Sequence, residues 1–166
     1  MRKLRTVAIA IIALYARQGI AAGLLEISDQ TTIFVSADEA WEEVGQDIFH
    51  FRGSFEIRTP RWAVTADEAI VYGKLDDLKR IVAEGSPVQF VFQNPELDNS
   101  SLTRAEGQRL EYEKEKGLLH LSGDAQLVSG EQLMRSSELR YDLKQEKLEA
   151  GGPEGVRITA KPKPRR

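Results

Sequence analysis

Four short acidic, alanine-containing phrases recur along this chain, and each is followed by a glycine that closes a strand-like segment. The phrases lie at 36–40, 65–69, 104–107 and 136–139, and the glycines, 32, 38 and 29 residues apart, are Gly53, Gly85, Gly123 and Gly152. His50 and His120 each stand three places before their glycine. Self-similarity at a period of about 20–50 residues is typical of stacked or rolled supersecondary units. The repeat therefore predicts a single architecture built from similar strand pairs.

Residues 24–160 alternate between apolar and polar side chains almost throughout, so every second residue faces the same side of a predicted strand. Around Gly53, for example, Phe51 and Phe55 share one face, whereas His50 and Arg52 share the other. The bulky apolar side chains that this alternation puts on one face are Phe49, Phe51, Phe55, Ile57, Trp62, Val64, Phe90, Phe92, Leu119, Leu121 and Leu127. They predict either an ordinary packed core or an apolar trough that accepts acyl chains.

Many short strands with one apolar face and no helical period require a sheet that closes on itself or folds over. A barrel, a sandwich and a rolled β-solenoid all meet this requirement. A helix over 37–44 is an alternative for one segment. A strand is favoured there, because the equivalent phrase at Ala66 continues into the strand-like residues 70–72. Turn residues at 45–47, 73–74, 115–117 and 129–131 separate the strands at hairpin distance. The predicted class is all-β and antiparallel.

The N-terminus has the pattern of an exported protein. A basic start is followed by an uncharged run over 6–16 and small residues at 19–22. A membrane span needs about 20 apolar residues, so we expect a cleaved signal peptide over 1–22 rather than a retained anchor. Its removal takes away four basic residues and moves the formal net charge from -3 to -7. An acidic chain lacks the basic stripe that a nucleic-acid partner requires.

The remaining bulk features concern stability and the C-terminus. The chain has no cysteine, so neither disulfides nor thiolate metal sites hold it together. The basic, proline-rich tail at 161–166 cannot join a sheet through its prolines and is expected to be extended.

Catalytic chemistry is not evident in the sequence. His50 and His120 lie on the polar face at equivalent repeat positions, which favours exposed strand residues over a catalytic pair. The carboxylates of the repeated phrases also recur, whereas an acid/base pair for glycoside hydrolysis is needed once. We expect these acids to sit at strand starts and to engage backbone donors or solvent. Without a metal-spaced ligand cluster or a glycine-rich phosphate loop, the sequence predicts no enzyme, no cofactor and no metal.

Several phrases together resemble a known family. They are the repeated Ala-Asp-x-Ala motif, the Phe-x-Gly closure before Phe55, and the segments 83–90, 119–125 and 140–142. In order and spacing they are similar to the OstA-like domain of the LptA-type lipopolysaccharide-transport family, over residues 30–159. The resemblance implies a folded-over antiparallel β-jellyroll over 24–160 with an apolar trough. It also implies a periplasmic protein, peripheral to membranes, that binds the lipid A part of lipopolysaccharide.

The family resemblance further implies head-to-tail strand pairing, both between copies of the chain and with the related domains of LptC-like and LptD-like proteins. The expected assembly edges are Thr32, Ile33, Phe34 and Val35 at one end and Val156, Arg157 and Ile158 at the other. The alternatives are an LptC-like membrane-anchored protein, another OstA-like envelope protein, a carbohydrate-active β enzyme and a purely structural envelope protein.

Overall fold

A computed structural model describes residues 32–93, 102–142, 144–145 and 147–160 of the chain. In this part the chain forms ten strands, which are β1 (Phe34–Ser36), β2 (Glu39–Glu43), β3 (Ile48–Arg58), β4 (Trp62–Lys74), β5 (Asp77–Gln93), β6 (Leu102–Glu113), β7 (Leu118–Ser129), β8 (Gln132–Asp142), β9 (Lys147–Gly151) and β10 (Arg157–Ala160). The predicted signal peptide at 1–22, the first residues of the predicted β domain at 24–31 and the tail at 161–166 lie outside the described residues. The described part contains no helix that is long and apolar enough to cross a membrane.

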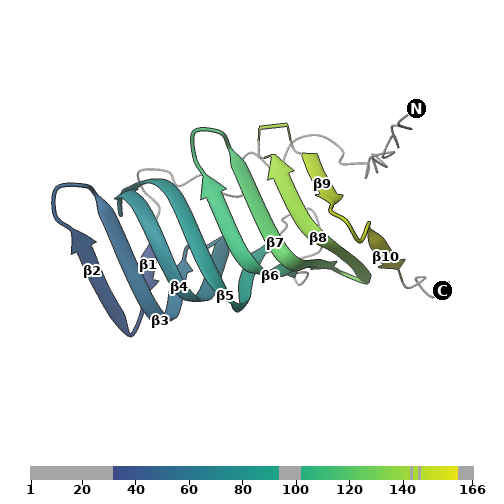
Figure 1. The fold of residues 1–166 in the computed structure, drawn as a ribbon, viewed down its shortest axis with the longest axis horizontal. Helices are drawn as coiled ribbons and strands as arrows, with labels where there is room; N and C mark the ends of the chain where they lie inside the picture. The colour runs from purple at the N-terminus through teal and green to yellow at the C-terminus, as the bar shows by residue number, and fades with distance from the viewer. Residues whose placement is uncertain (1–31, 94–101, 143, 146, 161–166) are drawn as a thin grey trace, which may run out of the picture.

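All ten strands belong to one antiparallel sheet that does not close. Its central order is β3-β4-β5-β6-β7-β8, so each long strand pairs with its neighbours in the chain. At one end β1 and β2 both pair with β3, and at the other end β9 and β10 both pair with β8. Figure 1 shows the strands side by side along the long axis, from β1 and β2 to β9 and β10. The expected all-β antiparallel architecture is therefore confirmed, in its folded-over form.

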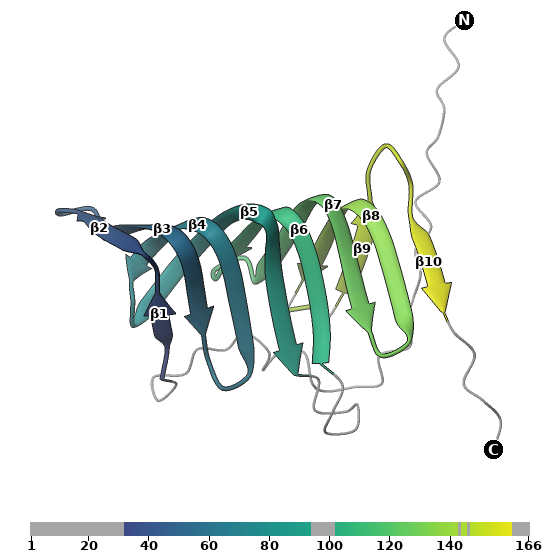
Figure 2. The same ribbon diagram turned by 90° about the horizontal axis from the view of Figure 1, so that it is seen from below.

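The long strands bend across a common line, which we call the corner. Their register shifts there, between residues 52 and 55, 65 and 68, 84 and 88, 106 and 109, and 122 and 125. A bulge adds a residue to one strand and bends it, so a row of bulges folds the whole sheet over on itself (Figure 2). The side opposite the corner, where the hairpin turns of both halves lie, we call the mouth.

Folding at the corner divides the sheet into two layers that face each other. The β1 layer contains β1, β10 and the halves of the long strands at 55–58, 62–66, 88–93, 102–107, 125–129 and 132–136. The β2 layer contains β2, β9 and the other halves of the same strands. The segment at 39–43, for which a helix was the alternative, is strand β2, and its Trp41 ring stacks on His50 at 5.0 Å.

The corner explains the sequence repeat. Gly53 has φ +74°, and a Cβ on it would lie 2.3 Å from Asp38 Oδ2. Gly123 has φ +78°, and its Cβ would lie 2.7 Å from that of Gln108. The first phrase thus reaches the corner against Gly53, and Gln108, directly after the third phrase, reaches it against Gly123. At these two positions only glycine combines the left-handed conformation with the close approach. The expectation that the acids stand at strand starts was wrong for Asp67, which lies inside β4. The expectation that they engage backbone donors is confirmed there, because Asp67 accepts a hydrogen bond from the Ser86 N–H (2.9 Å).

Candidate functional site

The space between the two layers is lined mainly by apolar side chains from one end of the sheet to the other. Directly opposite residues of an antiparallel pair point to the same face, so strand pairing defines rows that cross the sheet. One interior row of the β2 layer is Ala40, Phe51, Ala69, Ala83, Leu110, Leu121, Leu139 and Ala150. The facing row of the β1 layer is Val35, Ile57, Val64, Phe90, Ala105, Leu127, Met134 and Ile158.

All eleven apolar residues that the alternation assigned to one face lie on this interior. Eight are buried, and the half-buried Phe49, Phe92 and Leu127 pack against them in the same cluster. The aromatic members contact one another across the bend in Phe51–Phe55 (ring centroids 5.3 Å apart), across strands in Trp62–Phe90 (6.4 Å) and along one strand in Phe90–Phe92 (5.2 Å). The alternation therefore predicted the facing of these side chains correctly.

Part of the interior was not predicted from the sequence. Leu110 and Tyr112 are buried, although neither was among the apolar residues assigned to the inner face. The turn at 114–117 is exposed at Lys114, Glu115 and Lys116, but 110–113 belong to β6. The alternation of Leu110 and Tyr112 with Glu111 and Glu113 was the available signal. Other buried residues that were not singled out are Val71, Leu78, Ile81 and Val88.

The buried hydroxyl groups of Thr59, Thr103 and Ser136 have local hydrogen-bond partners. Thr59 Oγ1 accepts a hydrogen bond from the Trp62 N–H (3.1 Å), Thr103 Oγ1 lies 3.2 Å from Ser129 Oγ, and the Ser136 hydroxyl donates to the Glu138 carbonyl (2.7 Å). Burial raises the pKa of the Tyr112 hydroxyl above its ordinary value of 10.0. A buried polar group that already has a partner offers nothing to a polar ligand, so this interior suits an apolar one.

The outer faces carry nearly all the charges of the described strands, and several of these are paired across strands. His50 Nε2 lies 2.6 Å from Glu43 Oε1, and His120 Nε2 lies 3.0 Å from Glu138 Oε2. Both histidines thus occupy the outer face, as expected, each with a carboxylate on a neighbouring strand. Within the described residues no three potential ligands gather at a metal site. These contacts are typical of a solvated sheet face.

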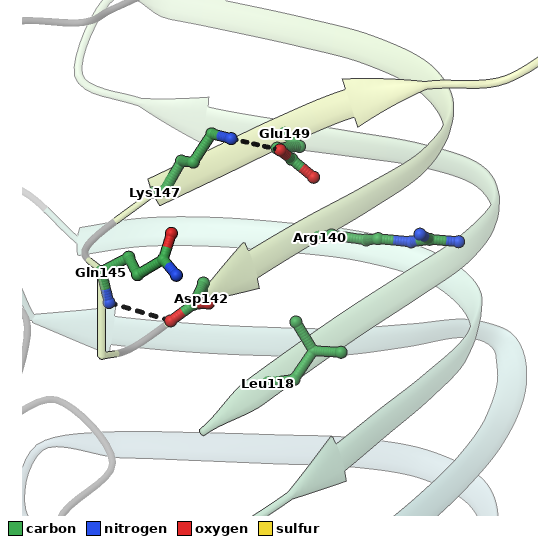
Figure 3. A pocket seen from close by; sticks show the side chains of 6 residues that line it. All are labelled: Leu118, Arg140, Asp142, Gln145, Lys147 and Glu149. Carbon is green, nitrogen blue, oxygen red and sulfur yellow. Dashed lines mark hydrogen bonds and ion pairs between the residues drawn. The ribbon is translucent and has the colours of Figure 1, made fainter. Parts of the chain in front are cut away.

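A small polar pocket lies on the outer face near β9 (Figure 3). It has a volume of about 90 Å³ and is lined by Leu118, Arg140, Asp142, Gln145, Lys147 and Glu149. Its charges are balanced: Lys147 Nζ lies 2.6 Å from Glu149 Oε1, and Asp142 Oδ1 accepts a hydrogen bond from the Gln145 N–H (2.9 Å). With its two cations and two carboxylates opposing one another, this pocket offers no distinct binding chemistry.

The expected assembly edges lie at the two ends of the sheet. Phe34 and Val35 belong to β1, with Thr32 and Ile33 just before it, while Arg157 and Ile158 belong to β10, with Val156 just before it. Phe34, Val156 and Ile158 expose 57%, 41% and 42% of their surface. The guanidinium of Arg58 lies 5.5 Å above the Phe34 ring. Since β1 and β10 each pair with one strand only, each leaves one backbone edge unpaired within the described sheet.

Comparison with known proteins agrees with this architecture. The family model described as "LptA/(LptD N-terminal domain) LPS transport protein" matches residues 34–147. The fold is similar to the crystal structure of LptH from Pseudomonas aeruginosa, described as the LptA homologous periplasmic component of the conserved lipopolysaccharide transport device. That likeness has a TM-score of 0.71 at 16% identity and covers 82% of this chain and 100% of the other. No curated protein sequence matches.

The family match spans well over half of the chain, and it runs through every strand from β1 to the start of β9. Its members are lipopolysaccharide-transport proteins and not enzymes, which agrees with the absence of catalytic motifs from the sequence. The chain therefore belongs to the LptA/(LptD N-terminal domain) family and has a general role in lipopolysaccharide transport.

Proposed function

We propose that this protein is a periplasmic carrier that shields the acyl chains of lipid A between its two layers. The observation that carries this proposal is the pair of apolar rows that cross the sheet without interruption from β1 and β2 to β9 and β10. An acyl chain that lies along these rows is removed from water along its whole length. Each CH₂ group that is buried contributes about 0.8 kcal/mol, so a chain of ordinary length is held strongly.

Acyl chains reach this interior by separation of the layers at the mouth. Every strand pairing described above lies within one layer, so away from the corner the layers meet through side chains. The eight buried predicted trough residues are at most 7% exposed, and the lipid therefore replaces contacts between protein side chains. The half-buried Phe49, Phe92 and Leu127 are the members of this set that the acyl chains contact first.

In the same proposal, the open ends join carriers into a bridge between the two membranes. The unpaired edges of β1 and β10 accept a further strand, either from a second copy or from the related domains of LptC-like and LptD-like proteins. A heterologous contact of this kind does not close on itself and makes a filament. The basic start and small residues of 1–22, together with the periplasmic location of LptH, support export to the periplasm.

Photo-crosslinking to lipopolysaccharide tests the trough. Leu127 and Val128 are neighbours in β7 with similar aliphatic side chains, but Leu127 packs in the interior cluster whereas Val128 is 39% exposed on the outer face. A photoreactive residue at 127 is expected to form a lipid adduct, and the same residue at 128 is the matched control. Adducts at both positions indicate adsorption to the outside of the protein. Absence of adduct at 127, with the variant folded, would refute the trough.

A further inference from the structure

The N-terminal end of the sheet presents two edges of different character. In the β1 layer, the interior positions next to the edge are Ile33 and Val35, and both are apolar and pack against the core cluster. In the β2 layer, the interior positions of the edge strand are Ala40 and Glu42, which pair with Phe51 and Phe49. One half of this end therefore continues the apolar interior, and the other half interrupts it with a charge.

The side chain of Glu42 faces the interior by the geometry of strand pairing. Glu42 stands directly opposite Phe49, which packs in the interior cluster, and opposite residues share a face. Its neighbours Trp41 and Glu43 lie on the outer face, where both contact His50. Glu42 is exposed, since none of the described strands covers the free side of β2. Along the described strands, it is the one charged side chain that pairing places on the interior rows.

The directions of the edge strands determine how a second copy would fit. β1 runs from the mouth to the corner and β10 from the corner to the mouth, while β2 runs away from the corner and β9 toward it. A second copy that continues the sheet in the same orientation is therefore antiparallel at both junctions. Continuing the rows sets Ile158 of one copy beside Val35 of the next, and Leu148 beside Glu42.

The two junctions differ in the free energy of forming them. In the β1 layer the pairing of Ile158 with Val35 extends the apolar interior. In the β2 layer, pairing of β9 with β2 places the Glu42 carboxylate against Leu148 and removes it from water, without a counter-charge on the interior rows. The same pairing brings Lys147 beside Glu43 on the outer face, but an exposed ion pair gains less than the desolvation of a carboxylate costs. An inward-pointing charge is a known way to keep an edge strand from pairing.

We propose that a second copy joins this chain through β10 and β1 alone, and that Glu42 keeps β9 and β2 apart. The inference rests on the head-to-tail assembly proposed above and adds which half of the end makes the joint. It makes the β2 layer discontinuous at every joint, so that the filament is held along one layer only.

The absence of cysteine from the sequence makes disulfide mapping direct. Directly opposite residues in antiparallel strands have Cα atoms about 4.5–5.5 Å apart, within disulfide reach. The β1-layer probe mixes a chain carrying Ser36→Cys with a larger, tagged chain carrying Arg157→Cys. The β2-layer probe mixes Glu43→Cys with tagged Lys147→Cys. The mixed disulfide is read from its mass after mild oxidation, so that random pairs of identical chains are distinguished.

In the otherwise unchanged chain we expect mixed disulfide from the β1-layer probe and background from the β2-layer probe. Glu42→Val in the Glu43→Cys chain is expected to raise the β2-layer yield at least about tenfold, because the desolvation cost is removed. Glu39→Val is the control, since Glu39 lies on the same strand but on the outer face, 3.8 Å from Arg52. It is expected to leave the β2-layer yield at background.

The outcomes separate this inference from the assembly on which it rests. If both probes give mixed disulfide in the chain with Glu42, the head-to-tail assembly stands and the one-layer joint is wrong. If Glu42→Val gives no more β2-layer disulfide than Glu39→Val, the role of Glu42 is wrong. If neither probe reacts above background and light scattering finds monomers at all concentrations, self-assembly itself fails, and the joint with it.

Discussion

Replacing Gly53 with alanine tests whether the corner of the fold depends on close approach as well as on backbone conformation. Gly53 has φ +74°, and an added Cβ would lie 2.3 Å from Asp38 Oδ2 and 2.9 Å from Asp38 Cβ. Asp38 has little freedom to withdraw, because its N–H donates to the Gly53 carbonyl (2.8 Å) and its Oδ2 accepts from the Ser54 hydroxyl (3.2 Å). Both a conformational and a steric cost are therefore expected.

The chain offers a control in which only the conformational cost is present. Gly45 has φ +83°, but a Cβ there meets nothing within 4 Å. A left-handed conformation costs a non-glycine residue about 1 kcal/mol, so Gly45→Ala should destabilise by about that amount. Overpacking adds about 1–3 kcal/mol, which brings Gly53→Ala to about 2–4 kcal/mol.

Equilibrium unfolding in urea measures both variants, since a lower midpoint at unchanged slope reports lost stability. Adding Asp38→Ala to Gly53→Ala should recover part of the loss, because it removes the oxygen at 2.3 Å and leaves the Cβ at 2.9 Å. Equal losses for Gly45→Ala and Gly53→Ala would refute the argument that the repeated phrases and glycines pack against each other at the corner.

Three further predictions concern the core and the titrating groups. Phe55 is 1% exposed, so Phe55→Ala should cost about 3–5 kcal/mol in urea unfolding, whereas Val44→Ala, at 94% exposure, should stay within about 0.5 kcal/mol. Burial raises the pKa of the Tyr112 hydroxyl, so its contribution to stability is fully present below pH 10.0 and is lost as pH rises through the folded-state pKa. In the Tyr112→Phe variant, the free energy of unfolding should fall less steeply over this alkaline range. The Lys114 hydrogen bond holds the pKa of Asp77 below 3.8, so a small stabilisation is present above that value and is lost as pH falls through the folded pKa. In the Lys114→Met variant, the pKa of the Asp77 carboxyl, measured by NMR titration, should return toward 3.8.

The interior could be predicted from the sequence where the alternation is regular. From Phe49 to Ile57 it continues across Gly53, and every apolar residue assigned to the inner face lies there. It failed where apolar residues occupy both parities. Val82 is buried although it belongs to an outer row with His120. The alternation of residues along one strand indicates which face of the sheet a side chain lies on. Whether that side chain is buried depends on the neighbouring strands and their side chains.

Lipid binding at the eleven trough residues and strand pairing at the two ends remain predictions, since both depend on a partner. The structure adds what a pattern cannot contain, namely which strand stands beside which and in what register. Glu42 illustrates the difference. In the sequence it is one of several acids in 38–43, and only its pairing with Phe49 distinguishes it from Glu39 and Glu43.

The sequence by itself determined the class of the fold, the inner and outer faces of its strands and the four-part repeat, because period-two alternation and turn residues act locally. Only the tertiary structure decided that the repeated phrases meet the glycines at one corner, that the sheet stays open and that its N-terminal end has one apolar and one charged edge. These features arise from contacts such as Asp38 with Gly53, whose partners lie on different strands. Their positions follow from the register of the whole sheet, which no single segment encodes.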